Sequence, residues 1–426
     1  MITDRRTGLV TALHHERLPA GLHVTHADLA WLGPAGGRPT VSGASWTSPD
    51  AATAAALGEA AERYCGHHTP QPTRLDTWHG MTERGRRAVD PHLLALYRAD
   101  QTVPFTGIAR TDPIDWLAGT DPHQERTWVP ASLCTLAAPP TGAAAHPPVS
   151  AAPPVSAAPP VSAAPPPVSA AHLPEAAAHL PVAAGVAAGP TPGRARAAAL
   201  AEVVERHALA TCWHAGTRFP LLRRTVAGFP GQLRAVPNLL FAPVVLAVVE
   251  DGDGLLGVGC ALADDADSAA GKAAAEACQS LRTVQLVAGG SLDWQPLRPY
   301  RPDRRYGDTY APDLSDATDI VCHAQLLADP RIAEAVTHRL AGGAPVPERH
   351  GWAASACPDL DTVLAARGLA ALTVDLTTPD VATAGYTVVR VVVPGLRSTA
   401  PAAFPFLGAG ADPLPDRPCL LPVPHV

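Results

Sequence analysis

The sequence predicts a mixed α/β fold in which helices pack on one face of one or more β-sheets. The first observation behind this prediction is a strand–turn–helix pattern that recurs three times with nearly constant spacing. The second is a set of short apolar runs, rich in Val and Leu, that lie between the helical segments. Apolar residues make up 47% of the chain and charged residues 17%, which is enough to build a sizeable core.

The repeated units occupy residues 42–66, 183–209 and 257–280. Each has a short extended stretch containing glycine, then a turn with Pro or Asp, then an Ala-rich helix carrying Glu-x-x-(Glu/Gln). Sixteen or seventeen residues separate glycine from glutamate in the pairs Gly43–Glu59, Gly185–Glu202 and Gly259–Glu276. A chance alignment of Ala-rich segments would not fix the acidic positions, so the spacing indicates three related units.

Further elements follow from apolar runs and turn residues. Residues 241–251 (FAPVVLAVVED) read as a buried strand. Near the C-terminus, residues 370–377 and 387–396 read as strands, and Pro379 with Asp380 opens a short helix between them.

Proline accounts for 47 residues, and its excess is concentrated between residues 137 and 181. The hexad VSAAPP occurs there three times, at 149–154, 155–160 and 161–166. Small residues, prolines and almost no charge cannot build a core, so we expect an extended, disordered insert, most simply a tolerated loop expansion. The predicted organisation is one domain in two parts, residues 1–137 and 182–426, separated by the insert at 138–181.

Composition excludes several classes of function. A net charge of −7 provides no basic surface for nucleic acid or an anionic membrane. Lys272 is the only lysine and lies in no phosphate loop, which disfavours phosphate-loop and Schiff-base enzymes. The longest apolar run is too short for a membrane span, and the N-terminus does not resemble a signal peptide. Eight scattered cysteines fit reduced thiols in a cytoplasm, and Cys65 with His67 and His68 lacks a second half for a metal site.

Charged residues of the repeated helices fall on one face, because positions i, i+3 and i+4 are neighbours on a helix. The three sets are Glu59, Glu62 and Arg63; Glu202, Glu205 and Arg206; and Lys272, Glu276 and Gln279. Solvated Glu–Arg pairs are the simplest explanation for one helix alone. If the three helices pack around a common centre, however, five carboxylates converge and require cations. Such oxygen ligands suit Mg²⁺ with a nucleotide, whose phosphates Arg63, Arg206 and Lys272 would neutralise.

The segments GEAAERY, AEVVERH and AEACQS, followed by VDLTTPDV and VVRVVVPGL, resemble the YcaO family, and specifically its azoline-forming cyclodehydratases. WVPASL at 128–133 is also similar, and the resemblance spans nearly the whole chain apart from the insert. It implies that ATP and Mg²⁺ are cofactors. By position it assigns Mg²⁺ and phosphates to Glu59, Glu62, Glu202, Glu205 and Glu276, with Arg206 and Gln279 assisting the nucleotide.

The resemblance also implies a role for the tail, since azoline formers often end in Pro-x-Pro-x-Pro with the terminal carboxylate near the active site. Here Pro422, Pro424 and Val426 are the corresponding catalytic candidates. The sequence departs from the family pattern at four positions: Ala55, Ala183, Ala184 and His207.

The implied reaction uses ATP to phosphorylate a backbone amide oxygen of a ribosomally made precursor peptide, converting Cys, Ser or Thr to thiazolines or oxazolines. Thioamide formation and a degenerate, non-catalytic partner protein are the alternatives. No segment reads as a leader-binding domain, so a separate leader-binding partner is expected, as is a possible homodimer.

Overall fold

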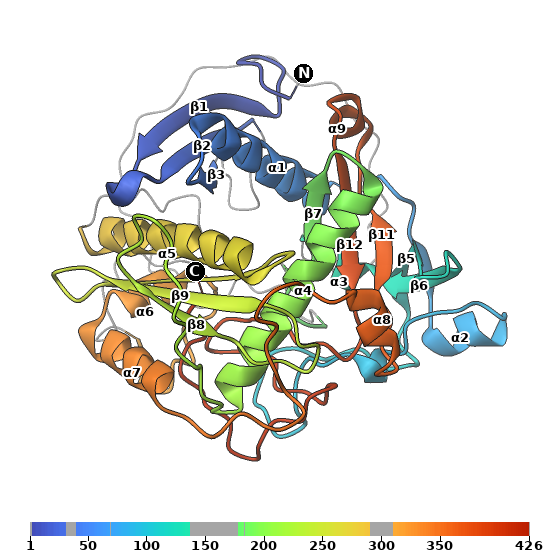
Figure 1. Cartoon of the computed structure of the whole chain (residues 1–426). Coiled ribbons are helices and arrows are strands. Elements are labelled where there is room, and N and C mark those ends of the chain that lie inside the picture. Colours follow the sequence, from blue (N-terminus) through green and yellow to red (C-terminus); the bar gives the residue numbers. More distant parts are fainter. Residues whose placement is uncertain are drawn as a thin grey trace, which may run out of the picture.

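The computed structural model describes residues 2–30, 40–68, 70–136, 178–182, 184–289 and 310–425. Within these ranges the strands form three sheets (Figure 1). The first is antiparallel, with order β1 (Val10–Arg17), β2 (His23–Leu29) and β3 (Thr40–Ser45). The second, also antiparallel, has order β10 (Leu256–Leu262), β9 (Val244–Glu250) and β8 (Gln232–Ala235).

The third and largest sheet lies beside these two. Its order is β4 (Arg74–Asp76), β5 (Ile114–Thr120), β11 (Leu372–Asp375), β12 (Thr387–Val392) and β7 (Val186–Gly189), and β6 (Arg126–Pro130) also pairs with β5. The shorter helices of the described chain are α2 (Trp78–Glu83), α3 (Ala131–Cys134), α6 (Cys322–Leu327), α7 (Pro330–Ala341), α8 (Leu360–Ala365) and α9 (Pro379–Thr383). The mixed α/β class predicted from the sequence is therefore confirmed.

Each sheet contributes one of the three predicted strand–turn–helix units. The long helices are α1 (Pro49–His67), α4 (Pro192–His214) and α5 (Ala266–Ala288), which follow β3, β7 and β10 after short turns. Each helix starts at a side chain that accepts a backbone N–H: Ser48 from Ala51, Thr191 from Arg194, and Asp265 from Asp267 and Ser268. Of the predicted turn residue types, aspartate caps α5 as Asp265, while proline occupies the first turn of α1 and α4 and a hydroxyl side chain caps each of these helices.

Glycine in the strands allows each helix to lie close to its own strand. A Cβ on Gly43 would lie 2.2 Å from the backbone nitrogen of Ala56, and one on Gly259 would lie 2.3 Å from the carbonyl oxygen of Ala273. Both distances are far below van der Waals contact, so no side chain fits between helix and strand. This close approach explains why glycine recurs at a fixed distance from the glutamates.

The units also contact one another in a closed cycle. Besides its own strand, α1 packs on β7, α4 packs on β10, and α5 packs on β3. Figure 1 shows the three helices arranged around a common centre, with the C-terminal segment ending close to it. The arrangement that the sequence left conditional, in which the helices converge, is the one observed.

The remaining elements agree with the expected positions. The strand predicted at 241–251 is β9, and the C-terminal strand–helix–strand is β11, α9 and β12. Most of the predicted insert, residues 138–177, lies outside the described residues. Its last four residues, 178–181, pack against the domain: Gly107 donates its N–H to the carbonyl of Ala178, and Ser132 Oγ lies 2.9 Å from His179 Nε2.

Five of the cysteines are buried, namely Cys65, Cys134, Cys212, Cys260 and Cys322. Cys65 is buried against Thr378, while His67 and His68 bond to carbonyls in the last turn of α1. In the part of the chain that the structure describes, no helix is both long and apolar enough to cross a bilayer.

The close contact at Gly259 generates a stability prediction. We expect Gly259→Ala to lower the free energy of unfolding by about 1–3 kcal/mol, because the new methyl group must push α5 away from β10. Gly271→Ala is the matched control, since a Cβ there meets no atom within 4 Å. Because Gly271 lies within helix α5, replacing it with alanine should instead raise the free energy of unfolding by about 0.5–1 kcal/mol. Urea unfolding of both variants tests this, and equal stability of the two would contradict it.

Candidate active site

Two glutamates bond to the backbone of their own unit. Glu202 on α4 accepts the N–H of Gly185, just before β7, at 2.8 Å. Glu276 on α5 accepts the N–H of Cys260 in β10 at 3.3 Å. A carboxylate that accepts a backbone N–H is held in one orientation, so each helix fixes its first glutamate against the strand that precedes it.

Two other glutamates bond across units. Glu62 on α1 accepts the N–H of Ala188 in β7 at 2.7 Å, and Glu205 on α4 accepts the N–H of Leu262 in β10 at 3.1 Å. These bonds follow the same cycle as the helix packing. They place the second glutamate of one unit at the strand of the next.

The third contact of the cycle, between α5 and the first sheet, is made differently. Gln279 occupies the position equivalent to the second glutamate and is half-buried. Trp46 instead donates its indole N–H to the carbonyl of Gly271 at 2.9 Å, and Arg282 pairs with Glu16 at 3.0 Å. An exposed ion pair and an indole bond therefore close the cycle where the acidic signature changes to glutamine.

Arg206 connects the glutamates to the C-terminal tail. Its Nη1 lies 3.0 Å from Glu205 Oε1 and donates at 3.0 Å to His425 Nδ1, while Nη2 lies 3.8 Å from Glu202 Oε1. Arg206 is 9% exposed and Glu205 is 6% exposed. The explanation of this stripe as a solvated Glu–Arg face is therefore wrong for α4.

The first helix presents a more open pair. Arg63 Nε donates to Glu59 Oε1 at 2.7 Å, with both side chains partly exposed. Although burial acts to raise the pKa of Glu59, Arg63, the hydrogen bond with Glu62 and the charge of Arg206 together outweigh it and the pKa is lowered. Burial and the neighbouring Glu59 carboxylate raise the pKa of Glu62 well above its ordinary value. One proton is thus favoured on Glu62 while Glu59 stays ionised.

The buried glutamates have raised pKa values as well. Burial raises the pKa of Glu205 to about 8, against the attraction of Arg206. Burial also raises the pKa of Glu276. The charges of Glu276 and Glu202 add to the raised pKa of Glu205, and the charge of Glu202 adds to the raised pKa of Glu276. A bound cation would relieve this repulsion and allow the carboxylates to ionise.

The glutamates fit a complex of Mg²⁺ with a nucleotide better than they fit a Mg²⁺ ion that is bound by protein side chains alone. Oε1 of Glu205 is buried and pairs with Arg206 Nη1 at 3.0 Å without accepting a hydrogen bond, so a guanidinium charge lies where a cation would bind this carboxylate. No three His, Cys, Asp or Glu side chains among the residues with assigned positions are grouped closely enough to hold an ion alone. Mg²⁺ commonly takes one or two carboxylates and completes its shell with waters and substrate phosphates.

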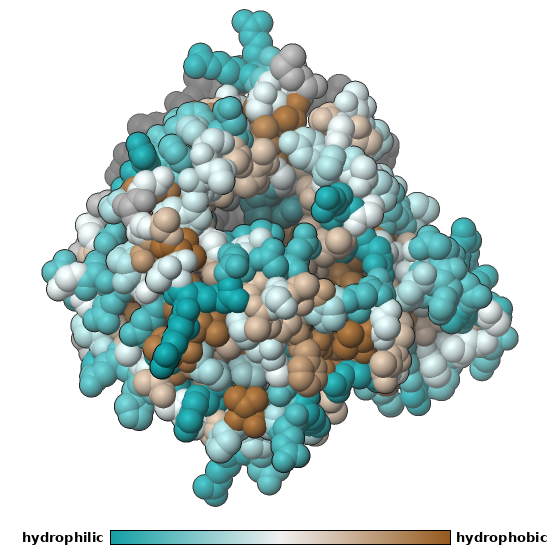
Figure 2. All heavy atoms as spheres, in the orientation of Figure 1, coloured by the Kyte–Doolittle hydropathy of each residue, from teal (hydrophilic) through white to brown (hydrophobic). Residues whose placement is uncertain are grey.

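A groove of about 590 Å³ opens at the first two units. Its lining comes from α1, the end of β7 and the turn between α9 and β12: Ala54, Ala55, Gly58, Glu59, Glu62, Ala188, Gly189, Pro190, Ala384, Gly385 and Tyr386. The space-filling view also shows the molecule hollowed between α1 and α5 (Figure 2), although the groove lining itself includes no residue of α5. The volume lies within the range of small-molecule sites.

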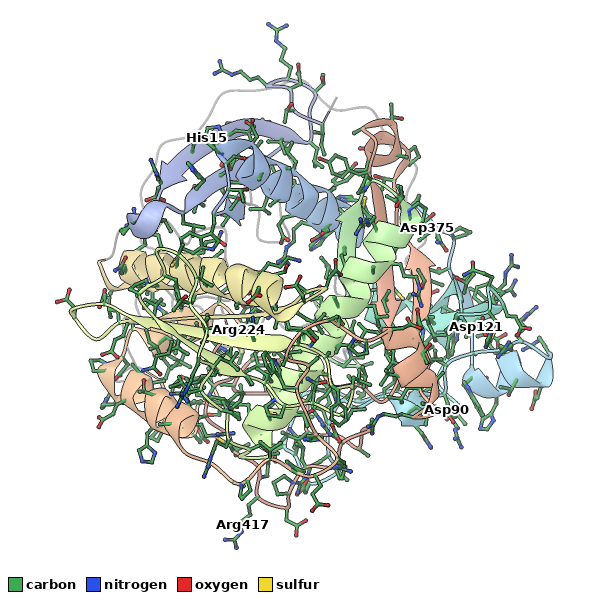
Figure 3. The ribbon with its side chains drawn as sticks, viewed as in Figure 1. His15, Asp90, Asp121, Arg224, Asp375 and Arg417 are labelled. Carbon is green, nitrogen blue, oxygen red and sulfur yellow. The ribbon has the colours of Figure 1, made fainter. Side chains whose placement is uncertain are left out.

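Side chains of α4 and α5 extend toward the space that these helices border with α1, whereas Asp90 and Asp121 lie at the far edge of the large sheet (Figure 3). Of the five predicted metal-binding glutamates, Glu59 and Glu62 line the groove. Glu202, Glu205 and Glu276 lie on the next two helices, where Glu205 is buried and the other two are half-buried. Lys272, expected to neutralise phosphate, is exposed on α5 and close enough to lower the pKa of Glu276.

The tail passes through the interior beside α4 and α6. Trp213 donates its indole N–H to the carbonyl of Leu421, and His323 bonds to the carbonyls of Val423 and His425. Pro422 and Pro424 are buried, and Val426 lies outside the described residues. The sequence predicts that the C-terminal tail lies near the active site. In the structure its last described residue, His425, contacts Arg206 of the glutamate cluster.

The four departures from the family pattern have different surroundings. Ala55 lines the groove, and Ala184 lies beside a second cavity. Ala183 lies outside the described residues. His207, where the pattern has an aspartate, is buried 3.5 Å from Asp412, which also bonds to His350 at 3.1 Å. Asp412, which is far from His207 in the sequence, thus supplies an acidic group near this position.

A known protein family matches most of the chain. The model of the YcaO cyclodehydratases, described as ATP- and Mg²⁺-binding, matches residues 45–152 and 165–397. The chain is a member of the YcaO family. The match covers all three glutamate-bearing helices, and by family ATP and Mg²⁺ are the cofactors of the chain. No curated protein sequence matches the chain.

Solved structures show the same fold at low identity. A heterocyclase in complex with substrate and cofactor is 20% identical, with a TM-score of 0.62 over 93% of this chain, which spans about half (51%) of that chain. YcaO from Methanopyrus kandleri, bound with AMPPCP and Mg²⁺, is 18% identical, with a TM-score of 0.53 over 91% of this chain and 86% of that one. The E. coli microcin synthetase McbBCD complex with pro-MccB17 bound has a chain that is 11% identical, with a TM-score of 0.62 over 97% of this chain and 96% of that one.

Sequence reasoning missed two features of this YcaO site. One is His425, whose position against Arg206 depends on tail packing across 219 residues. The other is the set of backbone N–H groups that hold the glutamates, for which the only sequence signal was the constant glycine-to-glutamate spacing. That spacing fits the bond from Gly185 to Glu202.

The raised pKa of Glu205 predicts a pH-dependent stability. Below its ordinary value of 4.5 the carboxyl is protonated whether folded or unfolded. Between 4.5 and about 8 only the unfolded state ionises, so the nucleotide-free protein should lose stability as pH rises, on the order of 1 kcal/mol per unit. Glu205→Gln should flatten this slope, while Glu334→Gln, exposed on α7, should not. Urea unfolding between pH 4.5 and about 8 measures this slope. An unchanged slope in Glu205→Gln would refute the raised pKa of Glu205.

Proposed function

We propose that this YcaO protein is a peptide cyclodehydratase that uses ATP to activate backbone amides and converts Cys, Ser or Thr residues to thiazolines or oxazolines. The observation that carries the proposal is the convergence of five glutamates from three helices, two of them lining a groove of about 590 Å³. This arrangement fits phosphoryl transfer, which depends mainly on positioning and on neutralising charge.

The glutamates are proposed to act together. The five carboxylates would hold Mg²⁺, which would supply positive charge to neutralise the charge that develops during phosphoryl transfer. Glu59 and Glu62 would reach it from the groove wall, and Glu202, Glu205 and Glu276 from the interior. The backbone bonds to Glu62, Glu202, Glu205 and Glu276 hold these ligands in place before the nucleotide arrives.

The arginines and Gln279 would contact the phosphates. Arg63 lies at the open end, paired with Glu59, and Arg206 lies at the buried end between Glu205 and His425. In the proposed reaction, a peptide side chain attacks the preceding carbonyl carbon. The resulting oxygen takes the γ-phosphoryl group, and inorganic phosphate then leaves as the ring is completed. The tail residues Pro422, Pro424 and Val426 are proposed to lie beside this step, since the tail reaches Arg206.

Two alternatives use the same fold. Thioamide formation would activate the same amide but accept sulfide, and the two buried tail prolines favour azoline formation over it. A non-catalytic partner protein is the second alternative, supported by Ala55 and Ala184. Retention of all five glutamates in bonded, converging positions opposes it.

The substrate and partners are part of the proposal. Similar folds occur in a heterocyclase in complex with its substrate and in a microcin synthetase complex with pro-MccB17 bound. We propose a ribosomally synthesised precursor peptide as substrate, a separate leader-binding protein as partner, a cytoplasmic location and a possible homodimer. The two parts 1–137 and 182–426 are proposed to act as one domain.

Replacing the two glutamates of α4 tests the function. Glu202→Ala and Glu205→Ala should abolish ATP-dependent peptide modification, because each removes a carboxylate that no neighbouring side chain can replace. Mass spectrometry detects the loss of one water per ring formed, and circular dichroism checks folding. Glu334→Ala on α7 is the control and should retain activity. Folded Glu202→Ala and Glu205→Ala variants that modify the peptide at the unaltered rate would rule out the Mg²⁺–ATP assignment.

The partner requirement is a separate prediction. The purified chain should bind ATP with Mg²⁺ but modify its peptide slowly, and a leader-binding protein should raise the rate, since an extended leader needs an accepting strand edge. Rates with and without candidate partners, measured on full-length and leaderless peptide, test this. Full leader-dependent activity of the chain alone would disprove the requirement without affecting the ATP site.

A further inference from the structure

Arg206 donates its one side-chain hydrogen bond within the described structure to the C-terminal tail. Its Nη1 donates to Nδ1 of His425 at 3.0 Å. Glu205 and Glu202 also attract the guanidinium, at 3.0 and 3.8 Å, but neither carboxylate accepts a hydrogen bond from it. Since a hydrogen bond depends strongly on direction and charge attraction depends mainly on distance, His425 fixes the orientation of this guanidinium.

Side chains of α4 and α6 hold the tail along its backbone. Every second carbonyl of residues 419–425 accepts a hydrogen bond: Cys419 from His214 at 2.7 Å, Leu421 from Trp213 at 2.9 Å, and Val423 and His425 from His323 at 3.0 and 3.1 Å. The three donor residues are at most 3% exposed. The backbone position of residue 425 is therefore set by buried groups and not by solvent-exposed contacts.

His323 can only donate to the tail. Ala402 donates its N–H to Nε2 of His323 at 3.1 Å, so the hydrogen of the neutral ring lies on Nδ1, where it faces the tail carbonyls. Burial lowers the pKa of His323 to about 4, which agrees with a neutral ring. One fixed tautomer thus holds the carbonyl of His425 beside Arg206.

His425 provides Arg206 with an acceptor without adding a negative charge. An imidazole that accepts at Nδ1 is neutral and carries its hydrogen on Nε2. Burial and the charge of Arg206 lower the pKa of His425 well below its ordinary value, in agreement with this state. Two glutamates already offset the charge of Arg206, and a third carboxylate at this position would leave less positive charge for an anionic ligand.

We propose that His425 is a positioning residue for Arg206, holding the guanidinium in the orientation from which it contacts the phosphates of a bound nucleotide. The proposal rests on the role of Arg206 in the proposed function. Without this acceptor, the guanidinium would be free to close on Glu205, whose Oε1 is buried and accepts no hydrogen bond among the described residues. Nucleotide affinity thereby depends on a tail residue that lies outside the glutamate-bearing helices.

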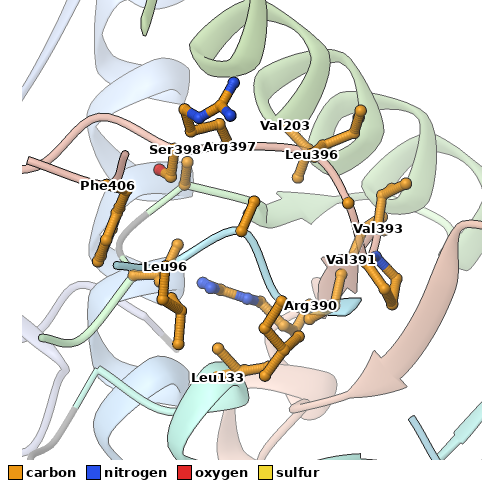
Figure 4. A pocket seen from close by; sticks show the side chains of 17 residues that line it. Leu96, Leu133, Val203, Arg390, Val391, Val393, Leu396, Arg397, Ser398 and Phe406 are labelled. Carbon is orange, nitrogen blue, oxygen red and sulfur yellow. The ribbon is translucent and has the colours of Figure 1, made fainter. Parts of the chain in front are cut away.

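The second cavity beside α4 takes no part in this contact. It has a volume of about 60 Å³, and Val203 is the one described residue of α4 that lines it (Figure 4). Neither Arg206 nor any residue of 419–425 belongs to the lining. Replacing His425 therefore leaves this lining unchanged.

Calorimetric titration of the full chain with ATP and Mg²⁺ tests the proposal, and thermal unfolding checks that each variant is folded. His425→Leu should weaken binding about tenfold, because it removes one hydrogen bond to a charged group. His425→Ala should show a comparable loss and provides the comparison if His425→Leu does not fold. His425→Asn should bind nearly as tightly as the unaltered chain, because its Oδ1 is a neutral acceptor near the position of Nδ1. His338→Leu, exposed on α7, is the matched control and should bind normally.

The order of affinities decides the outcome. Unchanged binding in folded His425→Leu or His425→Ala would overturn the positioning role. An equal loss in His425→Asn would overturn it as well, since the ring would then act through packing alone. Variants that follow the expected order in a chain that forms no azoline would refute the proposed reaction and leave the positioning role standing. Absence of nucleotide binding by the unaltered chain would overturn both.

Discussion

Hydrogen bonds from strand backbone to helix glutamates hold the three strand–turn–helix units in one arrangement. Glu202 and Glu276 bond within their own unit, whereas Glu62 and Glu205 bond to the strand of the next. Since the accepting groups are carboxylates of limited exposure, losing a bond would leave both a charge and a backbone N–H without a partner. The same contacts that connect the units therefore also orient the ligands of the proposed magnesium–nucleotide site.

The neighbouring glutamates of the site repel one another when they are ionised, and a bound cofactor can relieve this repulsion. Burial and neighbouring carboxylates raise the pKa of Glu62, Glu205 and Glu276, so the site without nucleotide retains protons. Binding of Mg²⁺ with ATP should release them, because a divalent cation favours the ionised forms. Arg206, whose pKa Glu205 and Glu202 raise despite its burial, moderates the repulsion and also receives the tail through His425. Stability and nucleotide affinity are thus coupled through the same carboxylates.

The cycle is not symmetric. Between α1 and β7, and between α4 and β10, a glutamate forms the contact, but between α5 and the first sheet Trp46 and the partly exposed pair of Arg282 and Glu16 replace it. Exposed ion pairs contribute little, because water and salt screen them. The contact between α5 and the first sheet is therefore the one that does not depend on a glutamate of the cluster.

The sequence by itself determined the class of fold, the three repeated units and the five glutamates, because helical periodicity and glycine spacing are local properties of the chain. It also placed β9 and the C-terminal β11, α9 and β12 correctly. Tertiary structure alone decided that the helices converge, that Glu205 and Arg206 are buried rather than solvated, and that His425 reaches Arg206. Those outcomes depend on contacts between residues as many as 219 positions apart, which no local pattern encodes.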